Sequence, residues 1–288
     1  METLYHYCSV NTFHSIIKGK AIWLSSLSLS NDSLEGKIVS EVISHLANEE
    51  KLDPATIKRL KEYIGYLEQS IDGLGFCLSE ESDLLSQWRG YANDATGFSI
   101  GLSKNYLEEL AGEYKTNKQT NGFRIQQVEY DQVKHIELVK PTFKKIKEQI
   151  ANGAFQIPGL RGILDTRTDE EFEEETKKIK AASKSLSIQV LMLYEQLFRL
   201  KSHAFKEEKE WRLLSPRLQS GDDNCKYRAT HNSLIPYRSY KIGKSAFNPI
   251  VEVIIGPKNM TPSNVVEGFL ISNGFTDVKV VKSKASYR

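Results

Sequence analysis

The order of the elements that the sequence predicts is the feature that most constrains the fold. Short alternations of apolar and polar residues open the chain at 4–9 and 21–26 and return in its final third. Such period-two alternation predicts half-buried strands. Two stretches with helical periodicity, at about 36–72 and 131–204, lie between these strands. We therefore expect a single α+β domain over residues 1–288, with two helical insertions.

The second insertion ends in a long amphipathic helix. Its apolar positions step by four and three residues, which places them on one helical face: Leu186, Val190, Leu193, Leu197 and Leu200. The stretch before them, TDEEFEEETKKIK, reads as a charged and solvated face. We expect the segment 168–204 to be where the chain binds a partner or self-associates.

Composition excludes several classes of function. The 39 Lys and Arg nearly balance the 37 Asp and Glu, so the strongly basic footprint of a dedicated DNA-binding protein is missing. The three cysteines form no CxxC and the six histidines no HExxH, so no metal site is predicted. No apolar run resembles a signal peptide or a membrane span, so we expect a cytoplasmic protein without a membrane partner.

The first strand, LYHYCS, places His6 between two tyrosines. A histidine in an aromatic strand is usually a hydrogen-bonded structural residue. A neutral imidazole can also hold the hydroxyl of a ribose. Both interpretations of His6 stay open at this point, and Tyr7 belongs to the same candidate wall of a pocket.

The stretch GFCLSEESDLLSQWRGYANDATGFSIGLS contains further candidates. Trp88 and Tyr91 are one helical turn apart and share a face. They are either core residues or an aromatic wall on which a flat ring stacks. Ser79 ends the strand GFCLSE, where its hydroxyl can serve a ligand or close a strand-end hydrogen bond.

The motif FKEEKEWRLL supplies two carboxylates. If KEWRLL is a strand, Glu208, Glu210 and Arg212 share one face. One carboxylate can then stabilise a developing positive charge while the other moves a proton. The structural alternative is an edge strand that carries charged side chains on its solvent-facing side, where Arg212 pairs with Glu210.

These motifs occur in an order that resembles a known family. LYHYCS, AIWLSSLSLSNDSLEG, FCLSEESDLLSQWRGYANDATGFSIGL, FKEEKEWRLL, VEVIIGPK and the terminal KSKASYR resemble the bacterial domain-of-unknown-function family 2971 over nearly the whole chain. A more distant resemblance is to ADP-ribosyltransferases. It implies a mixed, mainly antiparallel split sheet and the use of NAD as a substrate.

The same resemblance implies a role for each candidate in NAD binding. His6 would bind a ribose hydroxyl, and Tyr7 and Ser79 would belong to the NAD-binding residues. Tyr91 would stack on nicotinamide, together with Trp88.

The resemblance also implies how the carboxylates act. Glu210 would stabilise the oxocarbenium-like transition state as the glycosidic bond breaks. Glu208 would position or deprotonate the acceptor.

The expected function is an ADP-ribosyltransferase-like enzyme that modifies a macromolecule, either protein or nucleic acid, as a toxin or phage-defence effector. Hydrolysis of NAD without transfer is a close variant, and a 2′-phosphotransferase on RNA ends would use a related pocket. The alternative is a non-catalytic nucleotide-sensing or protein-interaction module. In an enzyme Glu210 should face an open cleft with His6 and Tyr91, whereas in the alternative it should pair with Arg212 or lie on an exposed edge.

Overall fold

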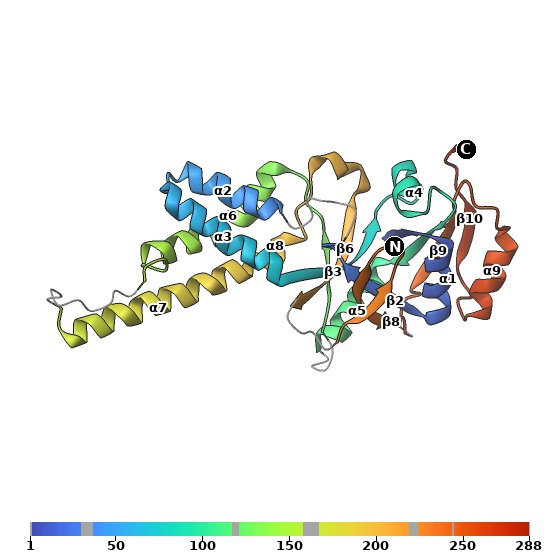
Figure 1. Ribbon diagram of the computed structural model, residues 1–288. Helices are drawn as coiled ribbons and strands as arrows, with labels where there is room; N and C mark the ends of the chain where they lie inside the picture. The colour runs from blue at the N-terminus through green and yellow to red at the C-terminus, as the bar shows by residue number, and fades with distance from the viewer. Residues whose placement is uncertain are drawn as a thin grey trace. The chain divides into compact units, whose positions relative to one another are not determined.

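The computed structural model describes residues 2–29, 37–116, 121–157, 167–218, 224–243 and 245–287. The chain forms two compact units. We call residues 1–31, 72–128 and 204–288 the sheet unit, and residues 32–71 and 129–203 the helical unit. Figure 1 shows the elements of both units along the chain.

The sheet unit is built on one mixed sheet. Its strands are β1 (Thr3–Cys8), β2 (Ala21–Ser26), β3 (Ile71–Ser79), β4 (Phe98–Ser103), β5 (Arg124–Gln127), β6 (Glu210–Leu218), β7 (Lys226–Ala229), β8 (Leu234–Lys241), β9 (Ile250–Ile255) and β10 (Lys279–Lys282). The strand order is β10-β9-β4-β1-β3-β2-β8-β7, with β6 paired to β3 and to β5. The pair β10–β9 is parallel, whereas β1–β4, β4–β9 and β2–β8 are antiparallel. The predicted α+β class with a mixed, mostly antiparallel sheet is confirmed.

Helices cover this sheet. They form where the apolar residues no longer alternate and instead recur every three or four positions. They are α1 (Val10–Gly19), α4 (Leu85–Tyr91), α5 (Lys104–Thr116), α9 (Ser263–Ser272) and the short 3₁₀ turn η1 (His203–Glu208). The side chain of Ser9 caps α1 by accepting from the backbone N–H of Thr12 at 3.2 Å. Figure 1 shows α1 beside α9, and the rings of Phe13 and Phe269 lie 5.9 Å apart between them.

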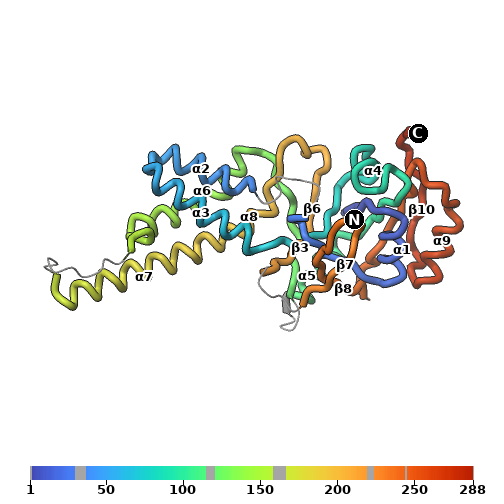
Figure 2. Tube along the Cα trace, viewed as in Figure 1, coloured from blue at the N-terminus to red at the C-terminus, as the bar shows by residue number. Residues whose placement is uncertain are grey.

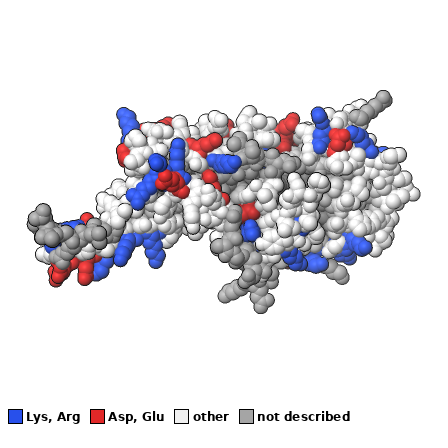
Figure 3. Space-filling model, viewed as in Figure 1, with Lys and Arg blue, Asp and Glu red and all other residues white. Residues whose placement is uncertain are grey.

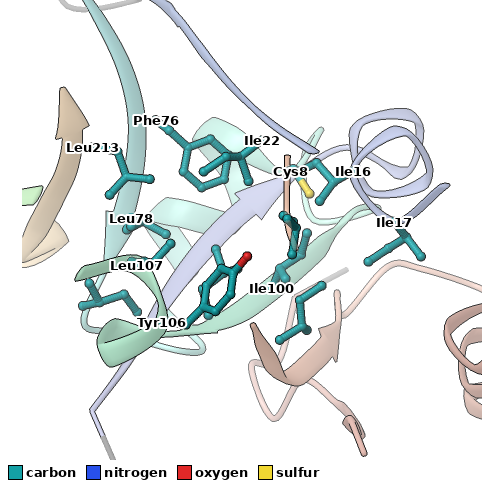
Figure 4. Close-up of a cluster of buried hydrophobic side chains, with 14 of the residues drawn as sticks. Cys8, Ile16, Ile17, Ile22, Phe76, Leu78, Ile100, Tyr106, Leu107 and Leu213 are labelled. Atoms are coloured by element: carbon teal, nitrogen blue, oxygen red, sulfur yellow. The ribbon is translucent and has the colours of Figure 1, made fainter. Parts of the chain in front are cut away.

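The core of the sheet unit gathers side chains from strands and helices that are distant in sequence. Figure 4 shows Phe76 and Leu78 of β3, Ile100 of β4 and Tyr106 of α5 converging around a buried cluster. All four side chains are at most 5% exposed. Burial of this kind is the main favourable term in folding, and it holds the sheet on which the candidate site is built.

The helical unit consists of α2 (Ile38–Glu49), α3 (Pro54–Ser70), α6 (Gln132–Ala151), α7 (Asp169–Met192) and α8 (Tyr194–Leu197). Thr168 and Glu171 form a capping box at the start of α7. All five predicted apolar positions are at most 3% exposed: Leu186, Val190, Leu193, Leu197 and Leu200. The prediction of one continuous helical face is corrected, because α7 ends at Met192 and Leu200 forms a β-bridge with Glu129 beyond α8. None of the described helices combines the length and apolar character needed to cross a membrane.

The two predicted insertions come together in this helical unit. Helix α6 packs against both α2 and α7, and α3 packs against both α2 and α7. The helices thus bury their apolar faces on one another and form a compact unit of their own, whereas the sequence patterns predict one domain over 1–288. Figure 2 follows the chain from the sheet unit into the helices and back twice.

Candidate functional site

His6 lies where β1 separates from β3. The pairing of these strands is limited to Tyr5 opposite Ser79. Beyond that point the His6 side chain binds β3, with its Nδ1 2.8 Å from the carbonyl oxygen of Cys77. Its ring also stacks on Phe76, with 3.9 Å between the ring centres. The imidazole therefore joins the two strands where their backbone ladder stops.

This contact sets the protonation state of the ring. A carbonyl oxygen only accepts hydrogen bonds, so Nδ1 of His6 carries the proton and Nε2 is left as an acceptor. Burial lowers the pKa of His6 to about 4, although the hydrogen bond to Cys77 acts in the opposite direction. At neutral pH the side chain is thus an uncharged hydrogen-bond acceptor on the Nε2 side.

Tyr7 and Ser79 shape the loop that follows β3. The Tyr7 hydroxyl donates to the carbonyl of Glu81 at 2.8 Å and accepts from the backbone N–H of Leu84 at 2.9 Å. The Ser79 hydroxyl donates to the carbonyl of Glu208 at 2.6 Å and accepts from the backbone N–H of Glu81 at 3.0 Å. Both hydroxyls donate to and accept from the backbone of the protein, so Tyr7 and Ser79 contribute to the structure of the site.

Trp88 is a core residue. Its side chain is fully buried and meets the Tyr7 ring edge-on at 4.9 Å. Its indole N–H donates to the Asp83 carboxylate at 2.6 Å. Asp83 also accepts from the hydroxyl of Ser283 at 2.5 Å and from the backbone N–H of Lys284 at 2.6 Å. Trp88 thereby fixes α4 and the C-terminal segment and offers no ring face to a ligand.

Tyr91 behaves differently from Trp88, although both lie on α4. Its side chain is 43% exposed, and its hydroxyl lies 3.2 Å from a carboxylate oxygen of Glu208. Glu208 itself is only 7% exposed. The structure thus brings together one aromatic and one carboxylate that are 117 residues apart in the sequence.

Glu208 and Glu210 do not share a strand face, which corrects the prediction from FKEEKEWRLL. Glu208 ends η1 and Glu210 begins β6. Between them Lys209 adopts a left-handed conformation with φ of 42°, which ends the extended backbone. The Lys209 carbonyl accepts from the backbone N–H of Glu80 at 3.2 Å, and its ammonium pairs with Glu81.

Glu210 is bound to Arg212 in a buried pair. Arg212 donates from Nε to one oxygen of Glu210 at 2.7 Å and from Nη2 to the other at 3.0 Å. Glu210 is 5% exposed and Arg212 is 1% exposed. This two-pronged geometry is the strongest form of an arginine–carboxylate contact. The structure therefore pairs Glu210 with Arg212, as the alternative interpretation of the motif requires.

Sequence reasoning missed Glu80, which connects the strands around the site. Its Oε1 accepts from the indole N–H of Trp211 at 2.8 Å and from the amide of Gln127 at 3.1 Å. The ammonium of Lys104 lies 4.1 Å from the centre of the Trp211 ring, in cation–π contact. The position of Glu80 directly after a buried strand was the available signal.

The helical unit contains a separate cavity, which no sequence pattern indicates. Its volume is about 330 Å³, and it is lined by Ile38, Glu41, Val42, His45, Gln132, His135, Ile136, Ser202 and His203. The ring of His135 is held by the carbonyl of Glu129, 2.8 Å from its Nε2. Among the described residues, no three or more His, Cys, Asp or Glu side chains are grouped so that they could hold a metal ion.

Comparison with known proteins supports one of the two resemblances. Residues 87–213 match the model of a family described as a protein of unknown function, DUF2971. The matched segment contains Trp88, Tyr91, Glu208 and Glu210, so it covers both motifs that meet at the site. No curated protein and no solved structure matches the chain significantly. The resemblance to ADP-ribosyltransferases stays a prediction.

Proposed function

We propose that the sheet unit binds NAD and acts as an ADP-ribosyltransferase-like enzyme on a macromolecular acceptor, with Glu208 at the reacting centre. The observation that carries this proposal is the contact between Tyr91 and Glu208. It combines a half-exposed aromatic ring, suited to stack on nicotinamide, with a carboxylate that can stabilise positive charge. The family match covers both residues.

His6 has the protonation state that the same proposal requires of a ribose-binding histidine. Its neutral ring keeps Nε2 as an acceptor, which is the group needed to hold a ribose hydroxyl. The bonds of Ser79 tie the end of β3 to the backbone of Glu208, so β3 joins the imidazole to the segment that carries the carboxylate. The His6 ring, however, points to the face of β1 opposite to Tyr7, against which Trp88 of α4 packs, so a role of His6 in holding the substrate rests on the resemblance alone.

The reaction can be written with atoms and charges balanced. The bond between the ribose C1′ and the nicotinamide nitrogen breaks, and its electron pair leaves with nicotinamide, which becomes neutral. The acceptor's nucleophile bonds to C1′ and its proton passes to a carboxylate and then to solvent. The Glu208 carboxylate favours this path because its negative charge stabilises the oxocarbenium-like centre. Water as the nucleophile would give hydrolysis of NAD instead.

This proposal assigns Glu210 to the architecture of the site. Its carboxylate is committed to Arg212 in a buried, two-pronged contact. The pair lies at the start of β6, directly after the turn that carries Glu208. Glu210 and Arg212 thus hold the strand from which Glu208 is presented.

The test compares Glu208→Gln with Glu207→Gln in the full chain. Purified proteins are incubated with labelled NAD, with and without cell lysate, and nicotinamide release and label transfer are measured. We expect Glu208→Gln to lose at least about tenfold in rate, and Glu207→Gln, an exposed neighbour, to match the parent. Tyr91→Phe removes only the hydroxyl and should have an intermediate effect. Turnover by Glu208→Gln at the parental rate would exclude Glu208 from the reaction.

A second candidate function is a non-catalytic nucleotide-sensing or protein-interaction module. The pairing of Glu210 with Arg212 favours it. In this case NAD raises the melting temperature of the parent without any release of nicotinamide. A partner would then be expected on α7, where Ile188, Leu191 and Met192 are 44–56% exposed.

A further inference from the structure

A second surface of the sheet unit carries stacked aromatic rings. Trp23 on β2 and Tyr237 on β8 stack with 4.4 Å between their ring centres and 29° between their planes. Trp23 is 39% exposed, which is high for a tryptophan. Its opposite neighbour on β8 is Ser239, and Tyr237 lies opposite Ser25. Because both opposite residues are small, they leave the aromatic rings prominent.

Cations surround these rings on the same face. Residues opposite each other in an antiparallel pair point to the same side of the sheet. Lys226 of β7 lies opposite Tyr237, Arg228 lies opposite Ile235, and Lys241 of β8 lies opposite Ala21. We call the surface formed by Trp23, Tyr237, Lys226, Arg228 and Lys241 the aromatic–basic face.

Negative charge is missing from these three strands. Their sequences, AIWLSS, KYRA and LIPYRSYK, contain no Asp or Glu. Within the part of the chain that the structure describes, no carboxylate forms an ion pair with Lys226, Arg228 or Lys241. Figure 3 shows Lys and Arg side chains gathered along the lower edge of the sheet unit, near the strands that Figure 1 labels β2 and β8.

We propose that the aromatic–basic face binds single-stranded nucleic acid. Unpaired bases stack on exposed aromatic rings, and phosphates bind Lys and Arg beside them. The face spans three strands about 4.8 Å apart, which is enough for on the order of three nucleotides. A duplex hides its bases within its own stack, so it offers this face only phosphates. This proposal does not rest on NAD binding or on Glu208.

Charge complementarity selects this partner over an apolar one. A protein partner that covered Trp23 and Tyr237 through apolar contacts would also bury three cations that have no carboxylate partner among the described residues, which is unfavourable. A strand of nucleic acid satisfies the rings and the cations together. The near-zero net charge of the whole chain does not exclude such a local group of cations.

The binding test uses labelled single strands of about twelve nucleotides, one of RNA and one of DNA, and a duplex of the same length. Fluorescence anisotropy of the full-length protein measures Kd at several salt concentrations. We expect single strands to bind more tightly than the duplex. Trp23→Ala should weaken binding by about 5- to 150-fold, and Trp23→Phe should restore most of it. The matched control is Tyr66→Ala, which removes a 74% exposed ring from the helical unit.

The salt dependence tests the cations separately. Each phosphate contact on a single strand contributes about 0.7 to the slope of log Kd against log salt. Replacing Lys226, Arg228 and Lys241 together by Gln should lower that slope by about 2, whereas Lys180→Gln on α7 should leave it unchanged. Lys226 and Lys241 are exposed, so replacing these two alone should keep the melting temperature close to the parental value and lower the slope by about 1.4, whereas Arg228 is half-buried. Absence of binding by the parent at low salt, equal binding of the duplex, or full binding by Trp23→Ala would each overturn the proposal.

Discussion

The pair of Glu210 and Arg212 allows a quantitative prediction. Both side chains are almost completely buried, and two hydrogen bonds of 2.7 and 3.0 Å join them. Removing one partner of a buried ion pair leaves the other charge without compensation, which costs about 3–5 kcal/mol. We therefore expect Arg212→Met and Glu210→Leu each to lower the free energy of unfolding by about that amount. In melting temperature this corresponds to a fall of about 6–20 °C.

The double variant gives the decisive comparison. When both charges are replaced by apolar side chains, no uncompensated charge is left, and such replacements are often neutral or stabilising. Glu210→Leu combined with Arg212→Met should therefore lie close to the parental stability. The coupling free energy from the double-mutant cycle should exceed about 3 kcal/mol. The matched control is the exposed pair of Lys178 and Glu174, where Lys178→Met should leave the urea midpoint at the parental value.

Urea denaturation followed by circular dichroism measures the cycle, and nicotinamide release is assayed on the same samples. If Glu208 is the reacting carboxylate, the stable double variant should keep most of any NAD turnover of the parent. The reasoning is refuted if Arg212→Met unfolds at the parental urea concentration. It is also refuted if Glu210→Gln loses all turnover without any loss of stability, because Glu210 would then act in the reaction itself.

Two further predictions concern His6 and the C-terminal segment. The pKa of His6 is lowered from 6.5 to about 4 in the folded protein. Between pH 6.5 and pH 4 the unfolded chain therefore binds more protons than the folded chain, and the free energy of unfolding should fall as the pH drops through this range. For this half-buried ring, the free energy of unfolding should fall by about 1–3 kcal/mol over that pH range. Urea titrations of His6→Gln should show a correspondingly weaker dependence of this free energy on pH. Asp83 accepts hydrogen bonds from Ser283 and from the backbone of Lys284, so Asp83→Ala should make residues 283–287 more susceptible to carboxypeptidase. An unchanged digestion rate by mass spectrometry would show that these bonds do not hold the segment.

Local patterns were sufficient to predict most of the elements. The alternation in LYHYCS becomes β1, and Leu186 and Val190 lie on the buried face of α7. Such features depend on residues close in sequence, and the period of the pattern follows directly from backbone geometry. The order of the strands in the sheet depends on pairings between distant segments, and the sequence alone could not assign it.

The candidate site was harder to predict because its contacts are long-range. The Ser79 hydroxyl binds the Glu208 carbonyl across 129 residues, and the Tyr91 hydroxyl reaches the Glu208 carboxylate across 117 residues. Trp88 and Tyr91 illustrate the same difficulty, since they share a helical face in the sequence pattern. Only the position of α4 in the structure makes Trp88 a core residue and Tyr91 a half-exposed ring.

The left-handed backbone of Lys209 explains how one short motif supplies two different carboxylates. On a continuous strand Glu208 and Glu210 would point to the same side, and Arg212 could neutralise either of them. A non-glycine residue with positive φ is strained by about 1–2 kcal/mol, so surrounding contacts must hold it. Here the Lys209 carbonyl accepts from Glu80 and its ammonium pairs with Glu81, both in the segment directly after β3. The turn therefore separates the carboxylate that stabilises β6 from the one that meets Tyr91, and it makes the geometry of Glu208 depend on the end of β3.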